Sequence, residues 1–209
     1  QIGCDASGLE LRCLAHYMND PEYINLILHG DIHTANQKAA GLECRNQAKT
    51  FIYSYLYGAG DVKVGSIVGG GAKEGKRLKK KFLEGTPALK VLRENVLAAA
   101  DRGWLKGING NRVRVRSAHS ALNSLLQSCG AIIMKVWLRI VIQTATKEGL
   151  DFMSLGSVHD EGQFQVLIKD VIRFKEICES SMLKAGEELK MRIAIEGEAM
   201  EGLTWADTH

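Results

Sequence analysis

The stretch 155–168, "LGSVHDEGQFQVLI", combines strand-forming residues with a cluster of ionisable groups. Val158 and the run 164–168 are mostly β-branched or apolar, at the short period that is typical of strands. Between them lies the triplet 159–161, a histidine followed by two carboxylic acids. Burying an ionised carboxylate costs a large free energy unless a partner compensates it. The pattern therefore predicts a β-hairpin with the two acids at or near its turn.

A further acid lies in the first twelve residues, "QIGCDASGLELR", where we predict a short strand ending at Asp5 and a helix from about Gly8. By itself, Asp5 is best explained as the N-cap of that helix. A hairpin turn that presents Asp160 toward this strand end would create a site with two carboxylates. Such groups repel each other unless a cation lies between them, and Mg²⁺ binds through one or two carboxylates together with substrate phosphates. We therefore expect metal ions and a triphosphate to compensate the acids.

The segment 45–60, "RNQAKTFIYSYLYGAG", predicts a helix with two chemically different faces. Two cations and two aromatic residues recur at intervals of four positions, so they share one face. Cations one turn apart can bind neighbouring phosphates, and the rings beyond them offer a stacking surface for a base. A surface helix with incidental charge is the alternative, and the spacing alone does not decide between the two. The residues of this face are Arg45, Lys49, Tyr53 and Tyr57.

The 209-residue chain has 45% hydrophobic and 24% charged residues, which is ordinary for a globular protein. Five scattered cysteines without a CxxC pair argue against a disulfide framework and a zinc knuckle. The most apolar stretch, Ala131–Ile142, contains two cations and is too short to span a bilayer, so it predicts a buried helix and no membrane partner. Because the chain opens with neither Met nor a signal peptide, we interpret Gln1 as an internal position of a longer protein.

Basic residues concentrate between Lys73 and Arg116, with 13 Lys or Arg against 4 Asp or Glu, although the whole chain carries a net charge of only +3. An exposed helix face is the usual explanation of such a run. Here two basic clusters, "KEGKRLKKKFLE" and "NRVRVRS", lie in one region. This arrangement favours a polyanionic partner such as nucleic acid.

The remaining patterns predict an α+β fold, an antiparallel sheet backed by helices, with a mostly helical insertion between about Asp20 and Ala100. The glycine-rich sequence 65–75 is predicted to be a loop, and a hairpin is expected around Asn109-Gly110. The predicted helices after residue 20 cover shorter pieces up to residue 41, then 48–57, 73–83, 87–100, 121–147 and 170–189, and a final strand covers 190–199.

Four motifs occur in order along the chain: "DASGLELRCLAH", "GDIHT", "RNQAKTFIYSYLYGAG" and "VHDE". Together they resemble motifs A, B and C of the family A DNA polymerases, the class of bacterial DNA polymerase I. The chain is most similar to the replicative polymerases of short-tailed bacteriophages, over essentially all of its length. The resemblance implies a palm over residues 1–19 and 117–209, with fingers and a basic hairpin over 20–116.

The resemblance also implies an activity, template-directed transfer of a nucleotide from a dNTP to a primer 3′-hydroxyl. Two Mg²⁺ ions would serve as cofactors, and Mn²⁺ could substitute for them. Asp5 and Asp160 would hold the ions, with the carbonyl of Ala6 as a further ligand. Glu161 would be an auxiliary acid near the primer end, and Lys49 would be a general acid toward the leaving pyrophosphate.

Further residues of the resemblance would bind the nucleotide and the DNA. Glu10 would lie under the sugar and exclude a 2′-hydroxyl, partly through a hydrogen bond to Tyr53, which would pack against the incoming sugar. The residues implied to bind the triphosphate are Arg45, Lys49 and His33. Those implied to contact template or primer are Tyr57, Gly58, Gln127, Asn123, Arg116 and His159.

The partners implied by the resemblance are primer–template DNA, dNTPs and a processivity factor bound through a thumb region. The sequences of a thumb and of an exonuclease domain are not present, so we expect a fragment that is truncated at its N-terminal side. A phage-encoded polymerase would act in the host cytoplasm.

Three alternatives follow from the same residues. A single-subunit RNA polymerase shares the architecture and the two aspartates, but Glu10 and "HDE" go with deoxynucleotide selection. A catalytically silent nucleic-acid-binding fragment would not need the intact acids and cations of the motifs. A metal-dependent hydrolase with the same carboxylates would leave the face of Arg45, Lys49, Tyr53 and Tyr57 unexplained.

Overall fold

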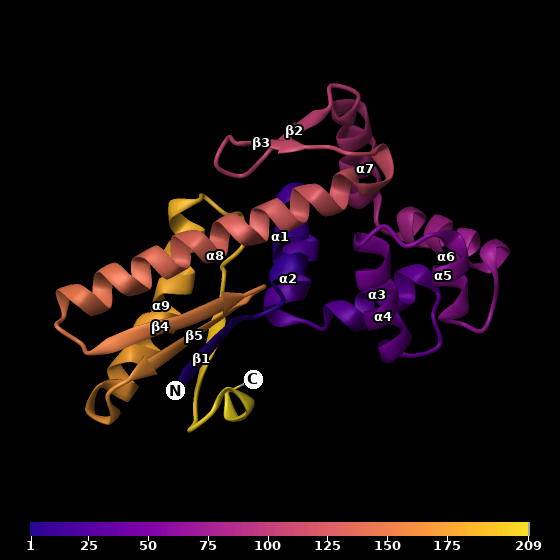
Figure 1. Cartoon of the computed structure of the whole chain (residues 1–209). Helices are drawn as coiled ribbons and strands as arrows, with labels where there is room; N and C mark the ends of the chain where they lie inside the picture. The colour runs from indigo at the N-terminus through magenta and orange to yellow at the C-terminus, as the bar shows by residue number, and fades with distance from the viewer. Residues whose placement is uncertain (209) are drawn as a thin grey trace. The chain divides into compact units, whose positions relative to one another are not determined.

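The computed structural model describes residues 1–208, which form two compact units. One contains residues 1–13 and 128–208 and is called the sheet unit below. The other, the helical unit, is Leu14–Gln127. Helices α1 (Leu9–Met18) and α8 (Ala121–Lys147) each contribute residues to both units (Figure 1).

The sheet unit is built on a four-stranded antiparallel sheet with the strand order β4-β5-β1-β6 (Figure 1). This confirms the predicted antiparallel sheet. Its strands are β1 (Ile2–Ala6), β4 (Phe152–Val158), β5 (Glu161–Val166) and β6 (Gly197–Glu201). Its other elements are α9 (Val171–Glu188), the part of α8 from Ser128 onward, and the short 3₁₀ helices η2 (Ile168–Asp170) and η3 (Trp205–Asp207).

One face of the sheet packs against α8 and α9 and forms the core of this unit. Ile2 and Cys4 alternate along β1 toward that face and are fully buried. On β5, the ring of Phe164 lies edge-on to Trp137 of α8, with centroids 5.9 Å apart. It also contacts Phe174 of α9, at 5.0 Å. The charged residues of β1 and β5 therefore belong to the opposite face.

Gly162 in β5 gives a stability test of this packing. A Cβ atom at this position would lie 2.5 Å from the ring of Trp137, which is fully buried and donates a hydrogen bond to the carbonyl of Cys178 at 2.9 Å. We expect Gly162→Ala to lower the free energy of unfolding by about 1–3 kcal/mol, because the ring cannot move without losing that bond. Gly156→Ala in β4 is the control, since a Cβ there meets nothing within 4 Å. Urea unfolding followed by circular dichroism measures both, and equal stabilities would contradict the prediction.

The helical unit contains short helices and one two-stranded hairpin. Phe82 of α6 lies edge-on to Phe51 and Tyr55 of α4, with centroid distances of 5.1 and 5.5 Å. This aromatic cluster joins the two helices. The elements are α2 (Pro21–His29), α3 (Ile32–Ala40), α4 (Arg45–Leu56), α5 (Asp61–Ser66), α6 (Ala72–Gly85), α7 (Pro87–Ala100), β2 (Trp104–Lys106), β3 (Arg112–Arg114) and η1 (Ala118–Ser120).

The helix starts in this unit follow from local chemistry. Asp20 and Asp31 are the N-caps of α2 and α3, and each side chain accepts hydrogen bonds from two backbone N–H groups of its helix. Pro21 and Pro87 occupy the first turns of α2 and α7, where no N–H is required. Gly41 ends α3 with a φ of 67°, a conformation that glycine adopts without strain.

The predicted glycine-rich loop 65–75 is only partly a loop. Helix α5 extends to Ser66 and α6 begins at Ala72. A side chain on Gly65 would collide with the backbone of Gly71, and one on Gly75 would collide with the backbone of Asp61. These two glycines therefore allow a close approach of α5 and α6, and the prediction of a continuous loop is wrong for this reason.

The predicted last strand over 190–199 is also displaced, since β6 is Gly197–Glu201. Ile193 and Ile195 are buried, as a strand pattern would require, but they precede β6. Ile195 packs against Gly186 of α9. The alternation of apolar residues here reflects an irregular segment that packs on a helix.

The long apolar helix is confirmed over the predicted range, α8 (Ala121–Lys147). The argument that it is too short to cross a bilayer is wrong, because the helical segment Ala118–Lys147 meets that criterion by length and composition. A buried core helix of a globular protein can meet the same criterion of length and composition. Within the sheet unit, Ile133, Trp137 and Val141 of α8 are fully buried against protein.

Candidate active site

Acidic residues gather on the face of the sheet opposite α8 and α9. Asp5 is the one exposed residue of β1. It pairs in register with Glu161 of β5 on one side and with Glu198 of β6 on the other. Residues directly opposite each other in neighbouring strands share a face of the sheet, so three carboxylates lie side by side on this face, near the end of β1.

Asp160 joins this group through the β4–β5 turn. The turn has only two residues, His159 and Asp160, between the paired positions Val158 and Glu161. The N–H of Ala6 donates a hydrogen bond to the carbonyl of Asp160 at 2.9 Å, which fixes the turn beside the end of β1. The predicted adjacency of Asp5 and Asp160 is therefore present at the level of the backbone.

The turn is held in an unfavourable conformation. His159 has a φ of 54°, in the left-handed region that non-glycine residues rarely adopt. Such a residue costs about 1–3 kcal/mol and persists where the surroundings fix it, commonly at functional sites. Here the β4–β5 pairing and the Ala6–Asp160 bond supply that constraint.

The electrostatics of the turn disfavour a charged Asp160. Burial raises the pKa of Asp160 above its usual range, and the nearby carboxylates of Glu10 and Glu161 raise it further. A backbone hydrogen bond and His159 oppose the rise. Glu10 lies on the first turn of α1, so the predicted sugar-contacting residue is close enough to influence the turn. A cation bound here would favour the ionised form.

Glu161 is buried, with 4% of its surface exposed, and its carboxylate is held by neighbouring side chains. It accepts a hydrogen bond from Gln163 and another from the indole N–H of Trp205 at 3.2 Å. Gln163 in turn bonds Thr208 at 3.1 Å. The C-terminal segment from η3 onward therefore packs on the acidic face, a contact that the sequence analysis did not predict.

Arg12 supports the segment that follows Asp5 and was also missed. It is 5% exposed and donates from Nε to the carbonyl of Ser7 at 2.7 Å. Its guanidinium also binds the carbonyl of Ala194 and the carboxylate of Glu196, the latter at 2.6 Å. The N–H of Ser7 also donates to the carbonyl of Glu196 at 2.9 Å. Ser7 and Arg12 therefore both connect the chain after β1 to residues 194–196, which precede β6.

The oxygen donors of the site fit a hard cation. In the part of the chain that the structure describes, no group of three or more His, Cys, Asp or Glu side chains is placed to hold a metal ion. The predicted donor set is smaller: it consists of the carboxylates of Asp5, on β1, and Asp160, in the turn beside that strand, with the carbonyl of Ala6. Mg²⁺ typically uses one or two protein carboxylates and completes its shell with water and substrate phosphates. The donor set thus suits Mg²⁺ only together with such a substrate.

In the helical unit, α4 has the two faces that its sequence predicts. Ala48, Phe51 and Ile52 are fully buried. Arg45 and Lys49 are exposed, Tyr53 is half-buried and Tyr57, just beyond the helix, is 50% exposed. Gly58 follows with a φ of 72°, and this left-handed residue ends the helix. The polar face is therefore accessible along its whole length.

Helix α3 adds His33 to the same surface. The rings of His33 and Tyr53 have centroids 6.4 Å apart. Arg45 donates from Nε to the N-cap carboxylate of α3, Asp31, at 2.8 Å, and this bond lowers the pKa of Asp31 below its usual range. Burial lowers the pKa of His33, and the charges of Arg45 and Lys49 lower it further. The three predicted triphosphate-binding residues are therefore brought together, with Asp31 as an unpredicted partner.

The remaining predicted residues divide between the two units. Asn123 and Gln127 lie one turn apart near the start of α8, in the helical unit, with Gln127 exposed. Arg116 is exposed just before η1 in the same unit, and His159 is exposed in the sheet unit. Each unit therefore carries its own cluster of predicted residues, acids in the sheet unit and cations with aromatics in the helical unit.

Comparison with known proteins identifies relatives over the whole chain. The DNA-directed DNA polymerases of Enterobacteria phage T3 and Escherichia phage T7 are each 44% identical over 100% of this chain. The chain spans 33% of the length of either relative. Its fold is similar to the POL domain of Pol1 from M. smegmatis, solved with DNA primer-template and dNTP, with a TM-score of 0.87 and 21% identity over 100% of this chain and 40% of that one.

The family model of DNA polymerase family A matches residues 1–207, nearly the full sequence. This match includes both units and each of the motifs in which the acids and cations occur. The chain therefore belongs to DNA polymerase family A.

Proposed function

We propose that this chain forms the palm and fingers of a template-directed DNA polymerase that transfers a nucleotide from a dNTP to a primer 3′-hydroxyl. The observation that carries the proposal is the strand register that sets Asp5 of β1 beside the Asp160 turn in a member of DNA polymerase family A. The phage relatives, which are DNA-directed DNA polymerases, support the reaction class. Action inside a phage-infected cell is part of the same proposal.

The palm is assigned to residues 1–19 and 117–209, and the fingers with the basic hairpin to 20–116. The division of the chain into a sheet unit and a helical unit supports this assignment. The borders differ by several residues because the two units meet within the continuous helices α1 and α8.

Asp5, Asp160 and the carbonyl of Ala6 would hold two Mg²⁺ ions, which Mn²⁺ could replace. Two ions bound there would lower the pKa of the primer hydroxyl and would neutralise charge on the leaving pyrophosphate. The chain's own contribution is to fix Asp5 on β1 and Asp160 in the turn beside the end of that strand, so that they need not reorganise during the reaction. Glu161 would act as an auxiliary acid near the primer end, in an orientation fixed by Trp205 and Gln163.

The helical unit would bind the incoming nucleotide. Arg45 and Lys49 would grip the triphosphate as cations one turn apart, with His33 beside them. Lys49 would donate a proton to the leaving pyrophosphate. Tyr53 would pack against the sugar, and Glu10 would exclude a 2′-hydroxyl.

The DNA contacts are assigned to residues beyond this nucleotide site. Tyr57 and Gly58 would lie where the templating base enters. Gln127 and Asn123 would probe the minor groove of the new base pair. Arg116 and His159 would contact the primer backbone.

The proposal is tested with the purified chain, a labelled primer annealed to a longer template, and the four dNTPs. Extension of the primer is expected only when Mg²⁺ or Mn²⁺ is present and only as the template directs. A chain that is folded by circular dichroism and binds the primer–template, and yet extends no primer at any metal concentration, would contradict the proposal.

The assignment of Glu10 is tested by sugar selection. If Glu10 excludes the 2′-hydroxyl, Glu10→Ala should raise the kcat/KM for a ribonucleotide, relative to the matching deoxynucleotide, by about 10–100-fold. Glu22→Ala is a matched control, because Glu22 is an exposed acid in the first turn of the next helix, α2. An unchanged ratio in Glu10→Ala would show that Glu10 is not the sugar gate.

A further inference from the structure

Three buried polar atoms of α2 and α3 lack a hydrogen-bond partner among the described residues. They are the hydroxyl oxygen of Tyr23, Nδ1 of His33 and the amide nitrogen of Asn36. Tyr23 is 5% exposed and Asn36 only 1%, so water has little access to these two side chains. A buried polar atom without a partner is unfavourable, because it has lost its bonds to water and gained none in return. Three such atoms in two neighbouring helices therefore require an explanation.

The three atoms belong to one cluster. His33 and Asn36 are three positions apart on α3, so their side chains lie on the same face of the helix, one turn apart. Side chains of a helix lean toward its N-terminus, and this directs the amide of Asn36 back toward His33. Burial raises the pKa of Tyr23 on α2, and the adjacent side chain of Asn36 opposes the rise, as a donor to the phenol oxygen does. Asn36 is therefore close to both of the other side chains.

The hydrogen-bond chemistry of the three atoms is complementary. A side-chain amide nitrogen carries two N–H donors, whereas an unprotonated imidazole nitrogen and a phenol oxygen each accept a bond. The amide of Asn36 has one donor for Nδ1 of His33 and a second donor for the oxygen of Tyr23. Hydrogen bonds of a free active site are often poorly aligned and tighten only when the substrate binds. The three atoms therefore suit a network that is completed in the complex with substrate.

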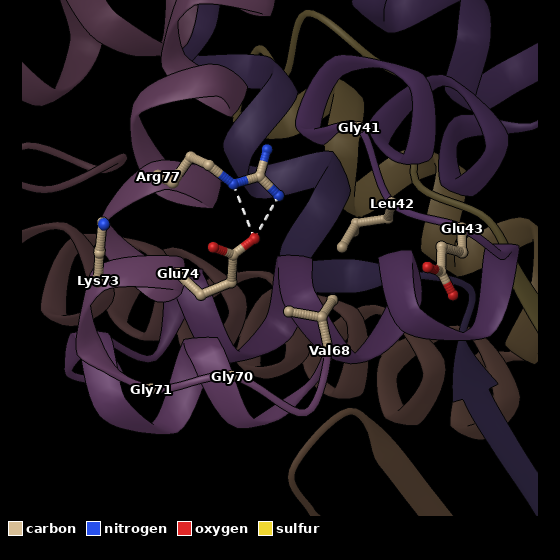
Figure 2. Close-up of a pocket in the computed structure, with 9 residues that line it drawn as sticks. All are labelled: Gly41, Leu42, Glu43, Val68, Gly70, Gly71, Lys73, Glu74 and Arg77. Carbon is tan, nitrogen blue, oxygen red and sulfur yellow. Dashed lines mark hydrogen bonds and ion pairs between the residues drawn. The ribbon is translucent and has the colours of Figure 1, made fainter.

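The far end of α3 does not share this property. Gly41, which ends the helix, borders a cavity together with Glu74 and Arg77 (Figure 2). There the guanidinium of Arg77 turns toward Glu74 and donates from Nε to its carboxylate at 2.7 Å (Figure 2). These two groups compensate each other, whereas the polar atoms around Asn36 do not. The unpaired atoms of α3 therefore lie in the part of the helix that carries His33.

The protonation of His33 gives the network a consequence for the nucleotide. Burial lowers the pKa of His33, and the charges of Arg45 and Lys49 lower it further, while Asp31 acts in the opposite direction. The imidazole is therefore mostly neutral at pH 7 and carries one proton, on one of its two nitrogens. Because Nδ1 is the buried nitrogen, a proton on Nε2 is the one that can be donated to a phosphate oxygen outside. The bond made by Nδ1 decides which nitrogen carries the proton.

We propose that Asn36 and Tyr23 are positioning residues for His33. When a nucleotide binds, the Asn36 amide donates to Nδ1 of His33 and holds the imidazole in the tautomer with its proton on Nε2, and that N–H donates to a phosphate oxygen. Tyr23 accepts the second N–H of the same amide and fixes its orientation. The phosphate contact of His33 rests on the proposed function, whereas the pairing of Asn36 with His33 does not.

The first test observes the imidazole directly and needs no synthesis. Long-range ¹H–¹⁵N correlation spectra of the chain labelled at its histidines distinguish protonated from unprotonated ring nitrogens, and His33→Ala assigns the signals. With Mg²⁺ and dTTP added, we expect Nε2 of His33 to be protonated and Nδ1 to be unprotonated. Asn36→Asp replaces the donor by an acceptor of the same shape and should move the proton to Nδ1. Asn36→Ala removes the donor without adding a charge and should give a mixture of both tautomers.

Primer-extension kinetics provide the second test. Asn36→Ala should raise the KM for dNTP about tenfold and change kcat less than threefold, because a phosphate contact held before and during the reaction affects binding alone. The double variant His33→Ala/Asn36→Ala should be no worse than His33→Ala, since Asn36 acts through that ring. Tyr23→Phe should raise the KM about threefold. Tyr55→Phe is the matched control, because its hydroxyl is also buried without a partner but its ring packs on Phe82 of α6, and its KM should change less than twofold.

Several results would overturn the inference. A proton that stays on Nε2 in both Asn36 variants would show that another group sets the tautomer. Independent, additive losses in the double variant would mean that Asn36 has only a structural role, and equal effects of Tyr23→Phe and Tyr55→Phe would remove Tyr23 from the network. His33 signals that do not respond to dTTP in the unmodified chain would also contradict it. A chain whose His33 responds as expected but that extends no primer would retain the positioning pair and lose the polymerase assignment.

Discussion

Replacement of Asp160 by asparagine is expected to lower Mg²⁺-dependent primer extension by at least about a thousandfold, which corresponds to ~4 kcal/mol in the barrier. The change keeps the size of the side chain and removes the charge that would hold a metal ion. It does not touch the backbone contact of the turn, because Ala6 donates to the main-chain carbonyl of residue 160. Single-turnover extension measures the rate, and Mn²⁺ titration followed by electron paramagnetic resonance measures the metal directly.

The same variant should be at least as stable as the unmodified chain. Burial and neighbouring carboxylates raise the pKa of Asp160, so the folded protein disfavours the ionised form. A raised carboxyl pKa reduces stability at neutral pH, and this penalty disappears as the pH falls below about 3.9, where the group is protonated in both the folded and the unfolded chain. Asp160→Asn should therefore raise the free energy of unfolding near pH 7 and leave it unchanged at low pH.

A neighbouring acid provides the control for Asp160. Glu198 is exposed on β6 and lies directly opposite Asp5, as Glu161 does on the other side. Glu198→Gln removes a carboxylate from the same face and should change the extension rate by less than about threefold, because its carboxylate is not part of the proposed donor set. If Glu198→Gln lost as much activity as Asp160→Asn, the general negative potential of this face would be responsible, and the assignment of Asp160 as a metal ligand would be wrong.

The local chemistry of this site could be predicted from the sequence because its signals have short range. Alternating residues around the triplet 159–161 predict a hairpin with acids at the turn, and β4 and β5 confirm it. The four-residue spacing from Arg45 to Tyr57 predicts a helix with one polar face, and the burial of Phe51 and Ile52 confirms it. In both cases the period of the side chains along a single element carries the information.

The contacts that support the site could not be predicted in this way. Trp205 reaches Glu161 across 44 positions of the chain, and Arg12 reaches Glu196 across 184. Neither pair belongs to a repeating pattern within one element, so no periodic signal marks them. Arg45 and Asp31, which are 14 positions apart, are a similar case. Only the folded arrangement of the chain shows which of these polar residues meet.

The loop prediction for the glycine-rich sequence 65–75 is wrong for a related physical reason. A glycine-rich sequence is typical of loops because glycine tolerates unusual backbone angles. Gly65 and Gly75 instead lie within helices, where their missing side chains let α5 and α6 approach each other. Sequence alone does not distinguish a requirement for conformational freedom from a requirement for space.

Lys49 is expected to show the second large effect, through the departure of pyrophosphate. General acid catalysis typically contributes ~10²–10⁴-fold to a rate, so Lys49→Gln should lower kcat by about 100–1,000-fold. The side chain is exposed on α4 one turn after Arg45, and its charge already influences His33. Asn46→Ala, an exposed change on the same helix but off this face, should alter kcat by less than about twofold.

An arginine variant distinguishes proton transfer from charge. Lys49→Arg retains a cation that can bind the triphosphate, but the guanidinium of arginine keeps its proton and so is a poor general acid. If Lys49 is the general acid, Lys49→Arg should keep the KM for dNTP within about threefold and still lose most of the kcat that Lys49→Gln loses. Single-turnover rates of the unmodified chain and of both variants measure this. Recovery of the full rate by Lys49→Arg would show that the charge alone is required and that the proton comes from another donor.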